Sequence, residues 1–316
     1  MPEPLIVLTG AAGRLGATVH RTLHDAGKNV RATDRFRAIS PGPPLIKANL
    51  FDPATCRRIV RDANILVHLA YRREPYGYPK GYPPRTFDEH ISLNRRIFQA
   101  ACEAGVKRII FSSSIQVIAR QLPLTSANQP PRYLPLDEKS PPEPDNWYSL
   151  AKWCTEEMLA MLRRQFGIDY VVLRFPALYN AVPVPHPEWY RSRQSEAFSY
   201  LSYRDAADLV LKIIDADLPG CRTYFPASRK NLLGLPPEEI IRDRYAGIPF
   251  RKPVAAKDGL VDISTLTREI GWEPLELSQP EAAPFMPLVW RLYKRVVRRV
   301  PKSLRPFVER VLSAFE

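Results

Sequence analysis

The sequence of 316 residues predicts an α/β protein built around a doubly wound parallel sheet. Two observations predict this fold class. Short apolar runs, typical of strands buried on both faces, alternate with amphipathic helical segments as far as residue 174. A glycine-rich turn at 9–16 follows the first of these runs and opens the first helix. Parallel strands joined by helices are the arrangement that this alternation favours.

Strands are expected where apolar residues run together between polar or turn-forming positions. The helices between them have recognisable ends: the first stops at Gly27, and Asp52 followed by Pro53 is a strong start for the second. The longest helix is expected to begin near Tyr148 and to reach about Phe166. The predicted strands are 5–8, 30–33, 45–48, 65–70, 108–111 and 170–174.

After residue 174 the pattern changes to shorter elements, with helices expected near 204–216, 236–245 and 262–270 and a strand at 223–225. We therefore divide the chain into consecutive predicted parts. They are a dinucleotide-binding Rossmann domain that carries the catalytic residues (1–174), a small substrate-binding region (175–284) and a basic amphipathic helical tail (285–316).

Composition and charge restrict where the protein works and what it binds. The four cysteines lie far apart, so we expect neither a disulfide framework nor a metal site. The N-terminus shows no secretory signal and no apolar run approaches the roughly 20 residues of a membrane span, which favours a cytoplasmic location. The net charge is +13, and residues 285–316 hold eight basic residues against two acidic ones. The rest of the chain is then only modestly basic, and nucleic-acid binding is not expected.

The turn at 9–16 has the composition of a dinucleotide phosphate site. Gly10 permits a tight turn after the strand, Gly13 lets the backbone approach a pyrophosphate, and Gly16 lets the helix pack closely on the strand. Free N–H groups at the helix start favour the negative phosphates. The residues expected to contact the cofactor here are Gly10, Ala12, Gly13, Arg14, Leu15 and Gly16.

Asp34, at the end of the second predicted strand, bears on the choice of cofactor. A carboxylate there can accept hydrogen bonds from the adenosine ribose and repels a 2′-phosphate, which favours NAD. Arg35 could instead hold that phosphate, so NADP stays the less favoured alternative. Asp34 could also serve only to cap the strand end.

Tyr148 and Lys152 lie one helical turn apart, so their side chains face the same way. A phenol with a pKa near 10 is a poor base at neutral pH, but a nearby ammonium favours the phenolate. A hydroxyl from the serine run 112–114 could hold the substrate oxygen. These groups together predict acid–base chemistry for hydride transfer at a carbinol carbon.

These motifs, over roughly residues 4–275, resemble the extended short-chain dehydrogenase/reductases of the NAD-dependent epimerase/dehydratase group. The resemblance implies that Ser114, Tyr148 and Lys152 are catalytic, with Tyr148 as the general base. It also implies a homodimer formed by the helices that carry Asn94 and Tyr148. Further cofactor contacts implied by it are Asn49, Leu50, His68, Leu69, Ala70, Asn94, Ser112, Tyr148, Lys152, Phe175 and Pro176; implied substrate contacts are Tyr71, Ser114, Gln116 and Arg191.

Departures from the family pattern bear on the substrate. Dehydratases of this group carry an acidic pair after the active-site hydroxyl, and Ile115 and Gln116 stand there instead. The short segment after the sixth strand is similar to that of the uronate dehydrogenases, although their Ser-Asn-His run is not present at 114–116.

These features favour an NAD-dependent oxidoreductase acting on a sugar, a sugar acid or a related alcohol or carbonyl compound. Two alternatives stay open: a sugar-nucleotide epimerase that retains its NAD, and a non-catalytic protein that senses a dinucleotide. Net NADH formation separates the dehydrogenase from the epimerase, because the epimerase forms none.

The tail 285–316 lies outside the family resemblance. Its basic residues recur at steps of three and four, and apolar residues occupy the other face of the expected helix. Packing on the protein's own body, contact with an anionic membrane surface, and binding of an acidic or nucleic-acid partner are the interpretations we weigh, the first being favoured.

Overall fold

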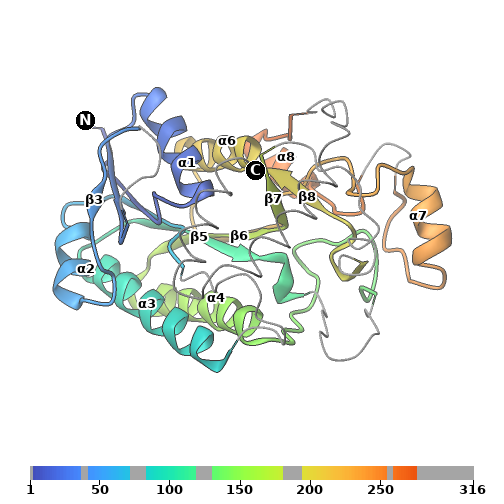
Figure 1. Cartoon of the computed structure of the whole chain (residues 1–316), viewed down its shortest axis with the longest axis horizontal. Helices are drawn as coiled ribbons and strands as arrows, with labels where there is room; N and C mark the ends of the chain where they lie inside the picture. The colour runs from blue at the N-terminus through green and yellow to red at the C-terminus, as the bar shows by residue number, and fades with distance from the viewer. Residues whose placement is uncertain are drawn as a thin grey trace, which may run out of the picture.

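A computed structural model of the chain describes residues 3–36, 42–71, 83–118, 130–180, 194–254 and 259–275. A single sheet of parallel strands, in the order β3-β2-β1-β4-β5-β6-β9, forms the centre of the molecule (Figure 1). This order confirms the predicted doubly wound α/β fold. The strands are β1 (Ile6–Thr9), β2 (Val30–Asp34), β3 (Ile46–Lys47), β4 (Ile65–His68), β5 (Arg108–Ser114), β6 (Asp169–Phe175) and β9 (Cys221–Tyr224).

Helices cover both faces of this sheet (Figure 1). α1 packs against α6 on one face, while α2, α3 and α4 pack side by side on the other. The helices are α1 (Arg14–Asp25), α2 (Pro53–Val60), α3 (Pro84–Glu103), α4 (Trp147–Phe166), α6 (Tyr203–Asp215), α7 (Pro237–Arg244) and α8 (Ser264–Ile270). Within the described ranges, we find no helix with the length and apolar character needed to cross a membrane.

Each central strand is buried on both faces. In β1, Ile6 and Leu8 face the core beneath α1 and α6, and Val7 faces the core beneath α2 and α3. All of them are 0% exposed. The continuous apolar runs in the sequence follow from this arrangement, because alternate residues must be apolar on both sides.

The start of α4 is fixed by its own residues. The side chain of Asn146 accepts a hydrogen bond from the backbone N–H of Ser149 at 3.0 Å. The hydroxyl of Ser149 in turn accepts one from the backbone N–H of Asn146 at 3.2 Å. This reciprocal cap places Tyr148 in the first turn, and Gly167 ends the helix with a φ of 71°.

The second half of the chain adds two strands that the sequence did not predict. β7 (Ala177–Tyr179) and β8 (Tyr200–Ser202) pair in parallel as a small separate sheet. β9 instead joins the main sheet beside β6, so residues beyond 174 contribute to the central core. The division at residue 174 stays a prediction, and the tail 285–316 lies outside the described residues.

Candidate active site

The glycine turn between β1 and α1 has no room for side chains at two positions. Gly10 has a φ of +76°, and a Cβ there would come within 2.6 Å of the backbone nitrogen of Ala70. A Cβ at Gly16 would overlap the carbonyl oxygen of Gly10. Gly13 caps α1 without a side chain, which leaves the helix start open to a phosphate. The turn therefore fits the pyrophosphate of a dinucleotide.

Asp34 lies beside this turn at the end of β2. One of its carboxylate oxygens accepts a hydrogen bond from the backbone N–H of Ala12 at 3.0 Å, and the other accepts from Phe36 at 3.0 Å. Asp34 thus connects the second strand to the phosphate turn, and its predicted contact with the ribose stays a prediction. The guanidinium of Arg35 lies 4.7 Å from the ring centroid of Phe36.

His68, at the end of β4, belongs to a buried chain of hydrogen bonds. Its Nδ1 lies 2.8 Å from the hydroxyl of Thr9, and its Nε2 lies 3.0 Å from the side-chain oxygen of Asn94 on α3. The amide nitrogen of Asn94 donates to the hydroxyl of Thr155 at 2.9 Å, and that hydroxyl donates to the carbonyl of Ala151 at 2.7 Å. The chain therefore links the strand that precedes the phosphate turn to helix α4.

The direction of this chain fixes the tautomer of His68. Because the oxygen of Asn94 can only accept, Nε2 must carry the proton and Nδ1 must accept from Thr9. Burial lowers the pKa of His68 to about 3, so the imidazole is neutral. His68 and Asn94 thus have partners within the protein; their predicted contact with the cofactor stays a prediction.

Lys152 lies on α4, one turn after Tyr148, and its side chain is buried against β5. Its Nζ donates to the backbone carbonyl of Ser112 at 2.6 Å and lies 5.6 Å from the ring centroid of Tyr148. Burial lowers the pKa of Lys152 to about 7, and the negative charge of Glu156 opposes this effect. The predicted Tyr–Lys pair is therefore close to the serine run.

Three rings meet beside Lys152. The ring centroids of Tyr71 and Tyr148 are 6.0 Å apart, and His90 lies 5.5 Å from Tyr71 and 5.9 Å from Tyr148. Tyr71 was predicted to contact substrate, and the structure brings it to Tyr148. His90 was missed by the sequence analysis. It precedes Asn94 by one helical turn on the inner face of α3, and that spacing was the available signal.

The serines of β5 have different surroundings. Ser114 is buried and accepts a hydrogen bond from the backbone N–H of Gln116 at 3.2 Å, which caps the short helix that follows. Ser113 donates to Glu156 at 2.5 Å, and Glu156 pairs with Arg174 at 2.8 Å. The sequence analysis missed both Glu156 and Arg174, whose contacts are tertiary.

The remaining predicted residues lie at the carboxyl edge of the sheet or outside the described residues. Asn49 accepts from the backbone N–H of Phe51 at 3.2 Å, and Leu50 is 7% exposed in the loop before α2. Phe175 is a buried residue that ends β6, and its predicted contact with the cofactor stays a prediction. Arg191 lies outside the described residues. Among the described residues, no group of three potential metal ligands occurs.

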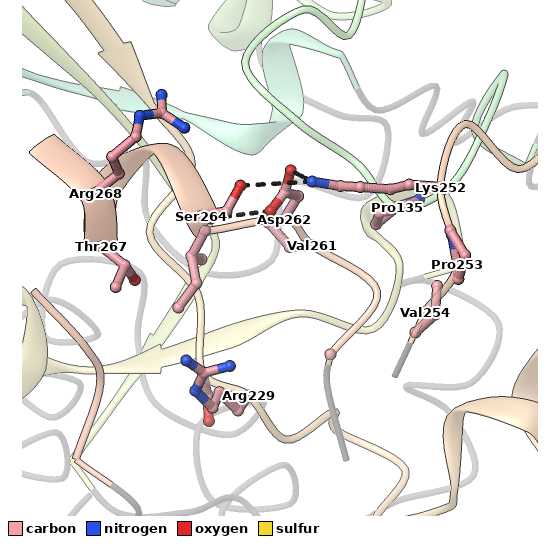
Figure 2. A pocket seen from close by; sticks show the side chains of 13 residues that line it. Pro135, Arg229, Lys252, Pro253, Val254, Val261, Asp262, Ser264, Thr267 and Arg268 are labelled. Atoms are coloured by element: carbon pink, nitrogen blue, oxygen red, sulfur yellow. Dashed lines mark hydrogen bonds and ion pairs between the residues drawn. The ribbon is translucent and has the colours of Figure 1, made fainter. Parts of the chain in front are cut away.

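A cavity of about 410 Å³ lies apart from these residues, between α8 and the loop at Pro135 (Figure 2). None of the predicted catalytic residues lines it. Each of its basic side chains faces a carboxylate; the ion pairs are Lys252–Asp262, Arg229–Glu273 at 3.0 Å and Arg268–Glu269 at 3.8 Å.

The sheet order, the glycine turn and the Tyr148–Lys152 pair define a dinucleotide-binding enzyme of the short-chain dehydrogenase/reductase type. More narrowly, the chain belongs to the NAD dependent epimerase/dehydratase family, whose model matches residues 6–198. The resemblance found in the sequence is confirmed, and with it NAD as the cofactor.

Two curated relatives are examples of what the chain is similar to. A uronate dehydrogenase of Pseudomonas putida is 26% identical over 212 residues, which cover 66% of this chain and 70% of that protein. A UDP-glucose 4-epimerase of Lactobacillus helveticus is 27% identical over 178 residues, or 54% of this chain. That match spans only 50% of the epimerase.

Solved structures share the fold. A short-chain dehydrogenase/reductase superfamily protein of Agrobacterium tumefaciens, with bound NAD, has a TM-score of 0.65 at 20% identity and covers 86% of this chain and 92% of its own. A UDP-glucose 4-epimerase of Bifidobacterium longum, in complex with NAD+ and UDP, also has a TM-score of 0.65 at 20% identity. It covers 87% of this chain and 94% of its own.

Proposed function

We propose that this protein is an NAD-dependent dehydrogenase of a sugar acid or a related sugar alcohol or carbonyl compound. The observation that carries the proposal is the placement of Lys152 Nζ between the carbonyl of Ser112 and the rings of Tyr148 and Tyr71. The match to a uronate dehydrogenase over 70% of that protein supports this substrate class.

Each residue has a separate task in the proposed reaction. When bound, NAD supplies the acceptor for the hydride of the reacting carbon. Tyr148 takes the proton from the substrate hydroxyl at its phenolic oxygen, and the ammonium of Lys152 favours the phenolate. Ser114 holds the substrate oxygen by a hydrogen bond. In the reductive direction, Tyr148 returns the proton to the same oxygen.

A panel of substrates tests this proposal. The protein is incubated with NAD and either D-glucuronate, D-galacturonate, UDP-glucose or UDP-galactose, and NADH is followed by its absorbance. We expect net NADH formation with a uronate and none with the UDP-sugars. Interconversion of the two UDP-sugars without net NADH would contradict the proposal and support the epimerase alternative. Tyr148→Phe serves as the inactive control.

We also infer that the protein is a homodimer. Trp147 and Met161 lie fourteen positions apart on one side of α4 and are 40% and 42% exposed. The ring of Phe87 on α3 lies 6.0 Å from Trp147, so the apolar surface extends over both helices. A second copy of the chain would cover it. Contact between the tail 285–316 and an anionic membrane stays a prediction of the sequence.

A further inference from the structure

Glu156 is a buried carboxylate one helical turn after Lys152. Its side chain is 6% exposed, and so is that of Arg174, its partner on β6. The Nε of Arg174 lies 3.1 Å from each carboxylate oxygen of Glu156, and its Nη2 donates at 2.8 Å. Such a bidentate pair fixes both the position and the orientation of the carboxylate.

A third contact joins this pair to the serine run. The hydroxyl of Ser113 donates to Glu156 at 2.5 Å, and Ser113 is paired directly with Arg174 across β5 and β6. The neighbouring Ser112 offers the carbonyl that receives the Lys152 ammonium. Glu156 therefore ties α4 to the strand segment that carries both the Lys152 acceptor and Ser114.

The charges around Lys152 give Glu156 a second effect. Lys152 contacts Tyr71 and Tyr148 through their rings, and His68 is the neutral imidazole nearby. His90 packs on Tyr148 from α3, and Arg174 adds a further positive charge behind Glu156. Among the described groups that surround Lys152, Glu156 supplies the negative charge. This charge raises the pKa of Lys152 and so opposes the lowering that burial causes.

We propose that Glu156 is a positioning residue of the active site, which holds the Ser112–Ser114 segment against α4 and favours the protonated form of Lys152. The catalytic task of Lys152 rests on the proposed function, whereas the effect of Glu156 on the protonation of Lys152 does not. A carboxylate without effect on Lys152 would leave the titration of Lys152 unchanged when the carboxylate charge is removed and the fold is kept.

The test is an NMR titration of Lys152. Protein labelled with ¹³C-lysine is titrated, and the Cε resonance of Lys152 is assigned from its absence in Lys152→Arg. In Glu156→Gln the midpoint of this resonance should fall by about one pH unit or more. Glu157→Gln, which removes the adjacent exposed carboxylate, should leave it in place. Equal midpoints in the wild type and Glu156→Gln would overturn the proposal.

Glu156→Gln alone leaves the Arg174 charge buried and could prevent folding. The double variant Glu156→Gln/Arg174→Gln removes both charges. Its Lys152 midpoint should fall by less than in Glu156→Gln, because loss of the Arg174 charge acts weakly in the opposite direction. An unshifted midpoint there overturns the proposal as well. With an active substrate, the alkaline limb of the kcat profile should move to lower pH by the same amount. The NMR shift without turnover of any sugar would contradict the proposed function only.

Discussion

The rings of Tyr71 and Tyr148 pack together with their centroids 6.0 Å apart, although the two residues lie 77 positions apart in the sequence. Tyr71 follows β4 and is 44% exposed, whereas Tyr148 lies in the first turn of α4. The contact places the phenol of Tyr148, the predicted general base, beside the exposed ring of Tyr71, which is predicted to contact the substrate. It connects the residue proposed for proton transfer to one proposed for substrate contact.

The first prediction concerns this pair of phenols. Tyr148→Phe keeps the ring contact but removes the acid–base group, so turnover should fall by at least about 10²-fold while NAD still binds. Tyr71→Phe should raise KM more than it lowers kcat, because it removes a hydroxyl from the predicted substrate contact and leaves the Tyr148 phenol in place. Steady-state kinetics and NAD titration measure both. Unchanged kcat in Tyr148→Phe would contradict the mechanism.

The preference for NAD over NADP should depend on the charge of Asp34. Asp34→Asn keeps an oxygen that can accept from the backbone N–H of Ala12 but removes the charge that repels a 2′-phosphate. We expect the ratio of NADP to NAD dissociation constants to fall about tenfold, the effect of one charge-assisted hydrogen bond. Asp25→Asn, on an exposed residue of α1, is the control. An NADP preference in the wild type would mean that Arg35 decides the choice.

His68 should make the protein less stable in acid. Its pKa is lowered to about 3 in the folded protein, so between about pH 6.5 and 3 the unfolded chain binds a proton that the folded chain excludes. The free energy of unfolding should therefore fall as the pH falls through this window, by up to about 1.4 kcal/mol per unit.

Denaturant unfolding of the wild type and His68→Gln at several pH values in this window isolates the effect. The variant should be less stable at neutral pH but should show a shallower pH dependence than the wild type. Identical slopes in the wild type and His68→Gln would show that other groups govern the acid sensitivity.

The homodimer should depend on the exposed apolar face of α4. Met161→Glu places a charge on that face, where an interface would have to bury it without a partner, so it should shift the protein from dimer to monomer at micromolar concentration. Leu235→Glu makes the same chemical change at a residue that is 40% exposed outside α4 and should leave the dimer intact. Light scattering after size-exclusion chromatography gives the mass. A monomeric wild type would contradict the dimer.

Local signals explain what the sequence could predict. The glycine turn is contained in eight consecutive residues, and Tyr148 and Lys152 are related by a single helical turn, so spacing alone brings their groups together. The long apolar runs of the central strands are equally local. These parts of the fold and of the site were predicted close to their observed positions.

Contacts between distant segments account for what was missed. The carboxylate of Glu156 reads in the sequence as an ordinary helix residue, and only the packing of α4 on β5 and β6 brings it to Ser113 and Arg174. β7 and β8 have three residues each, too few for a periodic signal, and they exist because they pair with one another.

The pairing of β6 with β9 has a practical consequence for shortened forms of the chain. Tyr170 to Leu173 are covered along one side by Cys221 to Tyr224, which arrive from the second half of the sequence. Cutting the chain after residue 174 would leave this apolar strand as an open edge, with unpaired backbone groups ready to join another copy. An isolated nucleotide-binding half is therefore expected to aggregate when expressed alone, and a soluble fragment must retain β9.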